Sequence, residues 1–383
     1  MKIDQLIKVF NERFTGDYAV FSAPGRINIL GEHTDYNNGF VLPAAIDKTI
    51  DLVIKINYNS NIIKVIANDL KEEESFNKET TAIRYHWTKY ILGVVCELEK
   101  LGCNIPGFDC VFGGNVPIGS GMSSSAALES VLGLALNELL NLKLSRFQLA
   151  KVGQLAEHNF VGVRCGIMDQ FASLFGEEGK LVKLDCRSMD YELIPFNTEA
   201  YSIVLIDTKV THNLASSEYN KRRTSCEEGV AIISSVYSDV KSLRDVSFYR
   251  LEEFIDEMNI ETYKRCLYVV GETDRLQKAC NALKQNDFIT LGRLMYETHD
   301  GLQLLYEVSC KELDFLVHTA GQFSGAIGSR MMGGGFGGCT ISLVETKKEE
   351  EFIEKTSDDF KIKFGYLPAI HKVKISSGAR RIF

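Results

Sequence analysis

The densest group of polar side chains in the sequence lies between Gly25 and Gly39. This segment combines a guanidinium, an imidazole, two carboxylates and three amides: Arg26, Asn28, Glu32, His33, Asp35, Asn37 and Asn38. A strand end and the loop after it would bring these groups into one small volume. Such a set suits a polyhydroxylated ligand, because each sugar hydroxyl carries a donor and acceptors that must be matched. The alternative, a hydrogen-bonded turn with ordinary surface charges, is the weaker interpretation at this density.

A second cluster, Gly113 to Gly121, runs into three serines and an Ala/Leu-rich segment typical of a helix. Unpaired backbone N–H groups and a helix N-terminus meet there, and together they form a cradle for an anion. The segment lacks the lysine of a P-loop, and it also lacks the GxGxxG spacing and downstream acidic residue of a dinucleotide fold. Taken alone, this cluster is better explained by a flexible turn capped by serine. It is not, however, the only such cluster in the chain.

A third cluster, Gly325 to Gly338, places five glycines around Phe336 just before a β-branched strand. Glycine costs conformational entropy and adds no packing, so we expect this backbone to approach a ligand or another loop closely. A plain bulge or hairpin turn is the alternative. Between the second and third clusters, Asp169 stands in an apolar neighbourhood. An aspartate there could cap the helix that follows, or it could act as a base in a dry site.

Hydrophobic periodicity predicts that a mixed set of helices and strands, in two lobes, positions these groups. Alternating or β-branched runs predict strands, and apolar residues spaced by three and four predict helices. The predicted strands are 18–22, 50–57, 62–67, 109–112, 201–207, 340–344 and 371–375, and the clearest helices are 88–101, 123–140, 146–159, 217–236, 274–284 and 312–320. The charged segment 71–81 predicts a solvated surface loop or an edge strand.

Length and composition narrow the function classes. At roughly 100–200 residues per domain, 383 residues predict two domains, and 45% apolar residues are typical of a folded chain. The net charge of −8 is spread without basic blocks, which argues against nucleic acid as a partner. The longest mostly apolar stretch, Val131 to Leu140, is shorter than the roughly 18 residues of a membrane span, so we expect no membrane partner.

The N-terminus and the cysteines predict a cytoplasmic protein. Asp4, Lys8 and Glu12 interrupt the apolar residues of the N-terminal segment, so it predicts an amphipathic helix rather than a secretory signal. The ten cysteines are scattered, with no CxxC pair. This pattern favours reduced thiols, most of them in the core.

Five segments in order resemble the galactokinases, a family within the GHMP small-molecule kinases. GRINILGEHTDYNNG (25–39) resembles the galactokinase signature, PIGSGMSSSAALE (117–129) the GHMP ATP loop, and RMMGGGFGGC (330–339) the third GHMP motif. AEHNFVGVRCGIMDQ (156–170) and HNLASSEYNKRR (212–223) are similar to further galactokinase segments. The resemblance implies an α+β fold with an N-terminal lobe like the second domain of ribosomal protein S5 and a ferredoxin-like C-terminal lobe. We expect the lobes to span 1–195 and 196–383, with a soft boundary that lets the last strand return to the N-terminal lobe.

The resemblance also implies ATP-dependent phosphorylation of the anomeric hydroxyl of galactose, giving galactose 1-phosphate and ADP at the start of galactose catabolism. It assigns the sugar contacts to Glu32, His33, Thr34, Asp35, Gly166 and Tyr219, and the phosphate cradle to Gly119, Ser120, Gly121, Met122, Ser123, Ser124 and Ser125. Ser125 and Glu157 match the Mg²⁺ ligands, a pair that leaves room for waters and phosphates around a hard octahedral ion. Asp169 matches the general base and Arg26 its basic neighbour, which would stabilise charge on the reacting oxygens.

Four residues outside the assigned site also bear on the resemblance. Trp87 and Tyr90 match residues near the adenine, although a lone tryptophan belongs to a core at least as often. Thr211 stands where many members carry Arg or Lys, and Met332 replaces a common threonine, so we expect changed kinetics but not a lost reaction. For the oligomeric state, we expect a monomer.

Two alternatives to a galactose kinase remain open. One is a GHMP kinase for another sugar, such as N-acetylgalactosamine or arabinose, because only the pocket contacts would differ. The other is a sugar- and ATP-binding regulator without turnover, because a fold alone does not settle function. The complete serine loop, together with Asp169 and Arg26, favours an active enzyme.

Overall fold

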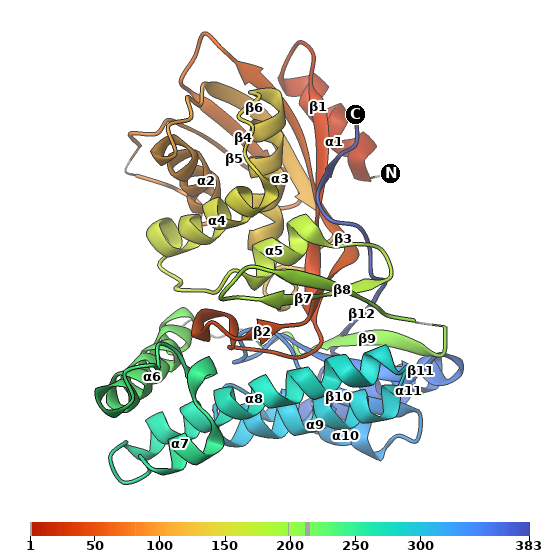
Figure 1. The fold of residues 1–383 in the computed structure, drawn as a ribbon. Coiled ribbons are helices and arrows are strands. Elements are labelled where there is room, and N and C mark those ends of the chain that lie inside the picture. The colour runs from red at the N-terminus through yellow and green to blue at the C-terminus, as the bar shows by residue number, and fades with distance from the viewer. Residues whose placement is uncertain (1, 81, 198, 211–214) are drawn as a thin grey trace.

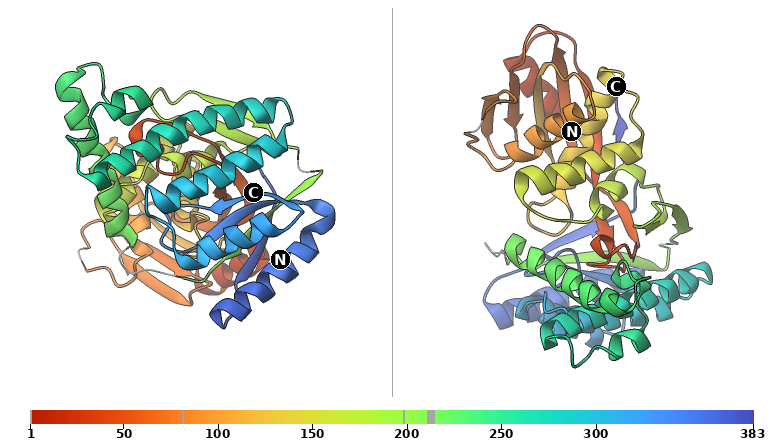
Figure 2. Two further views of the ribbon diagram at one scale, coloured as in Figure 1. Left: turned by 90° about the horizontal axis from the view of Figure 1, so that it is seen from below. Right: turned by 60° about the vertical axis from the view of Figure 1, so that its left-hand side comes forward.

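Two lobes, one above the other in Figure 1, make up the computed structural model, which describes residues 2–80, 82–197, 199–210 and 215–383. Both chain ends lie on the upper lobe in Figure 1 and in the right-hand view of Figure 2. Helices and strands are mixed in both lobes, which confirms the α+β expectation.

The upper lobe is built on a six-stranded sheet in the order β13-β1-β3-β6-β4-β5. Its strands are β1 (Ala19–Asn28), β3 (Pro43–Asn57), β4 (Ile63–Ala67), β5 (Glu72–Phe76), β6 (Gly107–Gly114) and β13 (Arg380–Arg381). All neighbours are antiparallel except β4 and β6. Through β13, the C-terminal residues return to lie beside β1. β5 forms one edge of the sheet, so the charged segment 71–81 contributes the edge strand, one of its two expected structures.

Helices cover both faces of this sheet. They are α1 (Lys2–Arg13), α2 (Thr88–Lys100), α3 (Ser124–Leu139), α4 (Arg146–Ala156) and α5 (Met168–Phe175). Side chains alternate along β1, so that Val20 packs with Leu6 and Phe10 of α1, whereas Phe21 joins Val131 of α3 in the main core. Because both faces are covered, β1 is buried along its whole length, and it carries Arg26 into the interior.

The lower lobe contains a four-stranded antiparallel sheet in the order β10-β11-β9-β12. Its strands are β9 (Tyr201–Asp207), β10 (Ala326–Met331), β11 (Cys339–Glu345) and β12 (Ala369–Val373). One face packs against α10 (Lys311–Gln322) and α11 (Glu349–Phe364), where Ile206 meets Leu316 and Phe352. The other face lies over α9 (Phe288–Leu304).

Three further helices form a separate core beside this sheet: α6 (Ala215–Val236), α7 (Phe248–Glu252) and α8 (Ile260–Lys284). A small sheet of β2 (Phe40–Val41), β7 (Lys180–Asp185) and β8 (Tyr191–Pro195) lies at the level between the lobes in Figure 1. The loop before β2 is therefore held where upper and lower lobes meet.

Several predicted elements differ in extent from the structure. The strand predicted to end at residue 22 continues to Asn28 as β1, since a register shift between Pro24 and Arg26 absorbs the proline and glycine that normally break a strand. The helix predicted over 146–159 ends at Ala156 and continues as a π turn, Glu157–Val161. The helix predicted over 274–284 is only the end of α8.

Two expectations about the chain as a whole can be compared with the structure. No helix among the described residues is long and apolar enough to cross a bilayer. All ten cysteines are free thiols and six of them are buried, which agrees with the expectation of reduced cysteines mostly in the core.

Candidate active site

A pocket of about 140 Å³, lined by both lobes, gathers most of the residues expected to do chemistry. Of the expected residues, those in its lining are Arg26, Glu32, His33, Asp35, Ser125, Glu157, Gly166, Asp169 and Tyr219. They come from the end of β1 and the loop after it, the start of α3, the turn after α4, the start of α5, and α6. Gly333 and Gly334 of the third glycine cluster complete the wall. Segments far apart in the sequence thus meet at one cavity.

Asp169, in the first turn of α5, is held by a two-pronged ion pair with Arg26. The Arg26 Nε and Nη2 atoms donate to the two carboxylate oxygens at 2.8 and 2.9 Å. Burial is the largest influence and would lower the pKa of Arg26, but the charges of Asp169, Glu32 and Asp35 and the Asp169 hydrogen bonds together outweigh it, so the pKa lies above its ordinary value. The Asp169 side chain keeps 30% of its surface exposed, while that of Arg26 keeps 5%. The carboxylate is therefore fixed in direction and still open to the pocket.

The same pair is connected to the serine loop. Arg26 Nη1 donates to the carbonyl of Gly121, and the Ser123 hydroxyl donates to Asp169 Oδ2. Ser123 adopts a left-handed backbone conformation, φ 58°, just before α3. Ser123 is expected to contribute its backbone to the phosphate cradle, and in this structure its hydroxyl is directed at the carboxylate of Asp169.

Asp35 lies against Gly166 with no space between them. A Cβ atom added at Gly166 would come within 1.9 Å of the Asp35 carboxyl, so only glycine fits there. Burial, and after it the nearby Asp169 charge, raises the pKa of Asp35 to about 7. Asp35 therefore titrates near neutral pH.

His33 and Tyr219 form an aromatic wall of the pocket, with ring centroids 5.1 Å apart. Burial lowers the pKa of His33 to about 3, so the imidazole is neutral at ordinary pH. Its Nδ1 atom lies 2.7 Å from the hydroxyl of Tyr36. Tyr219 also touches the glycine backbone, because a Cβ at Gly334 would lie 3.4 Å from its ring.

Glu32 is paired with an arginine that the sequence reasoning did not assign. Its Oε1 atom accepts hydrogen bonds from Arg330 Nη2 at 3.0 Å and from the Gly333 N–H at 2.8 Å. Arg330 is completely buried and also donates to the carbonyl of Ile29 at 2.7 Å. It stands inside the third glycine motif, and that position was the only sequence signal for its role. Arg330 joins the first and third glycine clusters.

Thr34, expected as a sugar contact, lies beneath the pocket and not in its lining. Its side chain is buried, and the hydroxyl donates to the Phe40 carbonyl at 2.6 Å, with the Gly31 carbonyl 2.9 Å away. These bonds close the loop between β1 and β2. In the structure, Thr34 shapes the loop that carries its two neighbours, His33 and Asp35.

The serine loop leads into α3, with Ser124 as the first residue of the helix. Gly119 and Gly121 have φ values of 75° and 79°, which suit glycine. Within the loop, Met122 is buried and Ser120 donates to the Pro117 carbonyl at 2.8 Å. The third glycine cluster packs against this loop, since a Cβ at Gly121 would lie 3.0 Å from the Met332 carbonyl oxygen. The close approach expected of the third cluster is made to another loop.

Ser125 and Glu157 form a hydroxyl–carboxylate pair at the pocket. The Ser125 hydroxyl donates to Glu157 Oε1 at 2.9 Å. Burial, followed by the Asp169 charge, raises the pKa of Glu157 to about 7. Among the described residues, no three or more His, Cys, Asp and Glu side chains are grouped as a site made by side chains alone would require. Such a hydroxyl and carboxylate suit Mg²⁺, which takes one or two protein oxygens and completes its shell with phosphates and water.

The remaining expectations fall outside the pocket. Trp87 is 8% exposed within the main core, donates from Nε1 to Glu72 at 2.7 Å and stacks on Tyr85. The structure therefore favours the core interpretation of this tryptophan. Tyr90 packs partly buried against the same core. Thr211 lies outside the described residues, and Met332 is buried.

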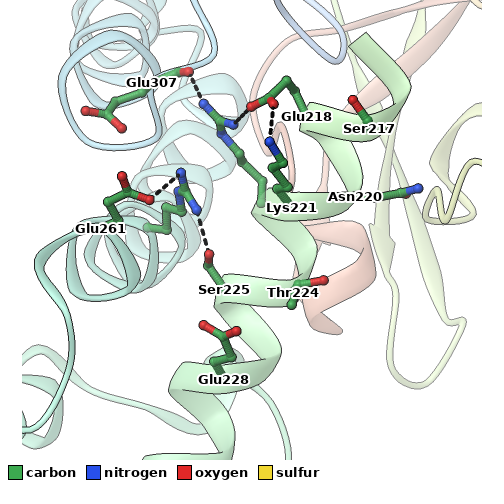
Figure 3. A pocket seen from close by; sticks show the side chains of 11 residues that line it. Ser217, Glu218, Asn220, Lys221, Thr224, Ser225, Glu228, Glu261 and Glu307 are labelled. Atoms are coloured by element: carbon green, nitrogen blue, oxygen red, sulfur yellow. Dashed lines mark hydrogen bonds and ion pairs between the residues drawn. The ribbon is translucent and has the colours of Figure 1, made fainter. Parts of the chain in front are cut away.

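A second, larger hollow of about 660 Å³ lies along α6 and α8 (Figure 3). Its two arginines are paired with neighbouring side chains: Arg222 bonds to Glu218 at 2.5 Å, and Arg265 bonds to Ser225 at 2.6 Å and lies 3.2 Å from Glu261. Of the residues predicted for chemistry, none lines this described surface. We therefore assign it no ligand.

Three family models match the chain. The galactokinase galactose-binding signature covers residues 8–56, the GHMP kinases N terminal domain covers 89–177, and the GHMP kinases C terminal domain covers 279–360. The first match contains the polar segment around Glu32 to Asp35, and the second contains the serine loop and Asp169.

Relatives with high similarity cover nearly the whole chain. It is 39% identical over 365 residues to a galactokinase of Thermotoga petrophila, covering 94% of this chain and 99% of the relative. It is 38% identical over 387 residues to a galactokinase of Clostridium beijerinckii, covering 99% of both. Among solved structures, Lactococcus lactis galactokinase complexed with galactose superposes with a TM-score of 0.94 at 32% identity, covering 99% of this chain and 100% of that one. A mevalonate kinase, at 20% identity and a TM-score of 0.65 over 94% of this chain and 99% of its own, shares the fold.

Proposed function

Because the chain belongs to the galactokinase family of the GHMP kinases and phosphorylates galactose with ATP, we propose that the pocket around Asp169 carries out this transfer on the anomeric hydroxyl. The observation that carries the proposal is the Arg26–Asp169 pair, with contacts of 2.8 and 2.9 Å beside the serine loop. It supplies a proton acceptor and a fixed positive charge in one place. Galactose 1-phosphate and ADP are then the products.

In this mechanism Asp169 accepts the proton of the anomeric hydroxyl. The hydroxyl oxygen forms a new bond to the γ-phosphorus, and the bond between that phosphorus and the ADP oxygen breaks. Arg26 stabilises negative charge on the reacting oxygens. In a loose transition state, positioning and electrostatics supply much of the acceleration and proton removal supplies less.

The phosphates of ATP would lie on the serine loop, Gly119 to Ser125, at the N-terminus of α3. Backbone N–H groups and the helix dipole favour anions there, which replaces the lysine of a P-loop. Mg²⁺ would be held by Ser125 and Glu157, whose oxygens lie 2.9 Å apart at the pocket. The ion, when bound, supplies neutralisation of phosphate charge.

The sugar would be bound by the wall opposite this loop. Asp35, His33 and Tyr219 line it, with Gly166 leaving the space that Asp35 fills. Glu32 lines the same wall while held by Arg330. Thr34 would contribute indirectly, through its bond to the Phe40 carbonyl.

The proposal also covers the lobe boundary, the oligomeric state and the cellular compartment. We place the lobe boundary near residue 195, between the end of β8 and the start of β9. A monomer would be sufficient, since both lobes of one chain line the pocket. The ten free thiols favour the cytoplasm as the compartment.

A coupled assay of ADP release tests this proposal, with Mg²⁺-ATP and with galactose, glucose, N-acetylgalactosamine and arabinose in parallel. NMR of the product identifies the phosphorylated carbon. We expect turnover of galactose ahead of the other sugars, with phosphate on the anomeric carbon. Faster turnover of another sugar, phosphate on another carbon, or binding without turnover would each contradict the proposal.

A further inference from the structure

A buried chain of hydrogen-bonding groups leads from the pocket into the lower lobe. His33 Nδ1 lies 2.7 Å from the Tyr36 hydroxyl, and that hydroxyl lies 2.7 Å from the Tyr306 hydroxyl. The Tyr306 hydroxyl in turn lies 3.3 Å from Cys226 Sγ. The four residues come from the loop after β1, the segment after α9, and α6. The proposed mechanism uses only the first of them.

Protons in such a chain can point in one of two directions. In one, the thiol donates to Tyr306, Tyr306 to Tyr36, and Tyr36 to the imidazole nitrogen. In the other, the imidazole N–H donates to Tyr36 and the chain ends with Tyr306 donating to sulfur. An sp² imidazole nitrogen is a strong acceptor and sulfur a weak one. The first direction is therefore favoured, and each bond in it strengthens the next.

The direction of this chain determines which ring nitrogen of His33 carries the proton. When Nδ1 accepts from Tyr36, the proton of the neutral ring must be on Nε2. The Nε2 atom is buried and makes no hydrogen bond of ordinary geometry among the described residues, although His33 lines the pocket; the Gly334 backbone is near enough to the ring to offset part of the burial effect on its pKa. A buried, unpaired N–H beside a pocket is a binding group that awaits a ligand acceptor.

From this geometry we infer that Tyr36 and Tyr306 are positioning residues that hold His33 as the Nε2–H tautomer, so that it donates a hydrogen bond to a sugar oxygen. The inference rests on the proposed sugar pocket. Carboxylates dominate the lining, with Glu32, Asp35, Glu157 and Asp169 as acceptors. A sugar hydroxyl can donate to one of these carboxylates and accept from His33 at the same time.

The surroundings hold the chain in place from both ends. Asn37 Nδ2 donates to the His33 carbonyl at 2.9 Å, and the rings of His33 and Tyr306 lie 4.8 Å apart. Arg222 donates to the Tyr306 carbonyl at 3.2 Å and to the Glu307 carbonyl at 2.6 Å, the second of which is drawn in Figure 3. Burial also keeps the His33 pKa at about 3, so the ring carries one proton only.

The direct test is nitrogen-15 NMR of the full-length protein labelled in histidine. The resonances of His33 are assigned as those that disappear in His33→Asn. We expect the chemical shift of an unprotonated, hydrogen-bonded Nδ1 and a protonated Nε2 in the wild type. In Tyr36→Phe the Nδ1 shift should move to that of a nitrogen without a hydrogen bond. A protonated Nδ1 in the wild type, or an unchanged Nδ1 shift in Tyr36→Phe, would overturn the inference.

The functional test compares Tyr36→Phe and Tyr306→Phe with Tyr296→Phe, a control whose hydroxyl has no partner among the described residues. We expect the KM for galactose to rise about 5–30-fold in Tyr36→Phe and less in Tyr306→Phe. The KM for ATP should stay within about twofold in all three, as should the galactose KM of the control. Unchanged galactose KM values in both chain variants would contradict the inference.

A panel of galactoses, each lacking one hydroxyl, separates this inference from the proposed pocket. The wild type should discriminate against the sugar that lacks the oxygen bound by His33. That discrimination should fall in Tyr36→Phe for the same sugar and stay unchanged for the others. If His33→Asn leaves galactose binding unchanged, the proposed sugar pocket itself is wrong. If His33→Asn weakens binding and Tyr36→Phe leaves every ratio unchanged, only the tautomer inference is wrong.

Discussion

Two arginines, Arg26 at the end of β1 and Arg330 at the end of β10, form ion pairs with carboxylates, and the pairs differ mainly in exposure. The Arg26 and Asp169 side chains are 5% and 30% exposed. Those of Arg330 and Glu32 are 0% and 2% exposed. Both arginines also bond to backbone carbonyls of neighbouring loops, Gly121 for Arg26 and Ile29 for Arg330. Identical chemical groups therefore serve two purposes, and solvent access separates them.

The two pairs serve different purposes because burying a charge costs free energy. A fully buried pair must satisfy every donor and acceptor internally, because removing two ions from water is expensive. Arg330 does so and thereby joins the first and third glycine clusters. Asp169 keeps one open edge, where a substrate can compete for its lone pairs. The comparison predicts that damage to the first pair appears mainly in the reaction, and that damage to the second appears mainly in stability, with any further effect on galactose binding arising through Glu32.

The largest effect is expected at the Arg26–Asp169 pair, whose carboxylate is open to the pocket. Asp169→Asn should lower kcat by roughly 10²–10⁴-fold, because the amide cannot take the proton of the sugar hydroxyl. Steady-state kinetics with saturating galactose and Mg²⁺-ATP measure this change. Calorimetric titration with galactose should find binding broadly intact. A kcat near that of the wild type would remove the general-base role and leave Asp169 as a positioning group.

The next largest effect is expected at the buried Arg330–Glu32 pair. Arg330→Met should destabilise the fold by about 3–5 kcal/mol, because Glu32 is left as a buried charge without compensation. Arg26→Met should cost less stability, since the Asp169 carboxylate can be hydrated. Urea unfolding of both variants measures the difference. Equal losses of stability would break the comparison, and the double variant Arg330→Met with Glu32→Leu should recover part of the loss.

The sequence predicted the residues of the pocket better than it predicted the long-range side-chain contacts that hold them. Asp169, Glu157 and Ser125 lie in segments that carry readable motifs, and the structure brings them to one pocket. The third glycine motif contains Arg330 but assigns it no role, because a buried ion pair between residues 298 positions apart leaves no local pattern. The same holds for the bond from Tyr36 to Tyr306, which is 270 positions long.

Element boundaries failed where tertiary contacts override local propensity. β1 continues through Pro24 and Gly25 because pairing with β3 resumes after the register shift, and no sequence rule foresees that. β7 and β8 were missed because they are short and contain charged residues, so their alternation is weak. Thr34 shows the same limit in the site, since a motif position does not say whether its hydroxyl meets ligand or backbone.

A smaller effect is expected at Thr34, and it tests whether this residue stabilises the fold as the buried Arg330–Glu32 pair does. Thr34→Val should destabilise the fold by about 1–3 kcal/mol, because the partly buried Phe40 carbonyl loses the donor supplied by the buried Thr34 hydroxyl. Turnover should stay within about twofold at temperatures where the variant is folded. Thermal unfolding and kinetics on the same samples check both statements, with Thr34→Ser as the matched control. A large loss of galactose affinity without loss of stability would return Thr34 to the sugar contacts.

The smallest effect concerns Asp35, a pocket carboxyl with no ion pair among those found in the described residues. Its pKa is about 7, against 3.8 for an ordinary aspartate, so the folded protein holds the proton more tightly than the unfolded chain. The folded state therefore loses stability from this group as pH rises from about 4 to 7. Asp35→Asn should gain thermal stability over the wild type across that window, with a constant difference above it.

Galactose affinity should depend on the ionisation of Asp35 in the opposite direction, rising as pH rises. The ionised form accepts more sugar hydroxyl bonds than the protonated form, so galactose affinity should fall by up to about tenfold from pH 8 to pH 6. Calorimetry without nucleotide or Mg²⁺ leaves out metal binding at Glu157, and proton release should be seen in buffers of different ionisation enthalpy. Asp35→Asn should bind galactose more weakly and without this pH dependence. A pH dependence that persists in Asp35→Asn would assign the titration to another group, and would leave Glu157, whose pKa is also raised to about 7, as the first carboxylate to test.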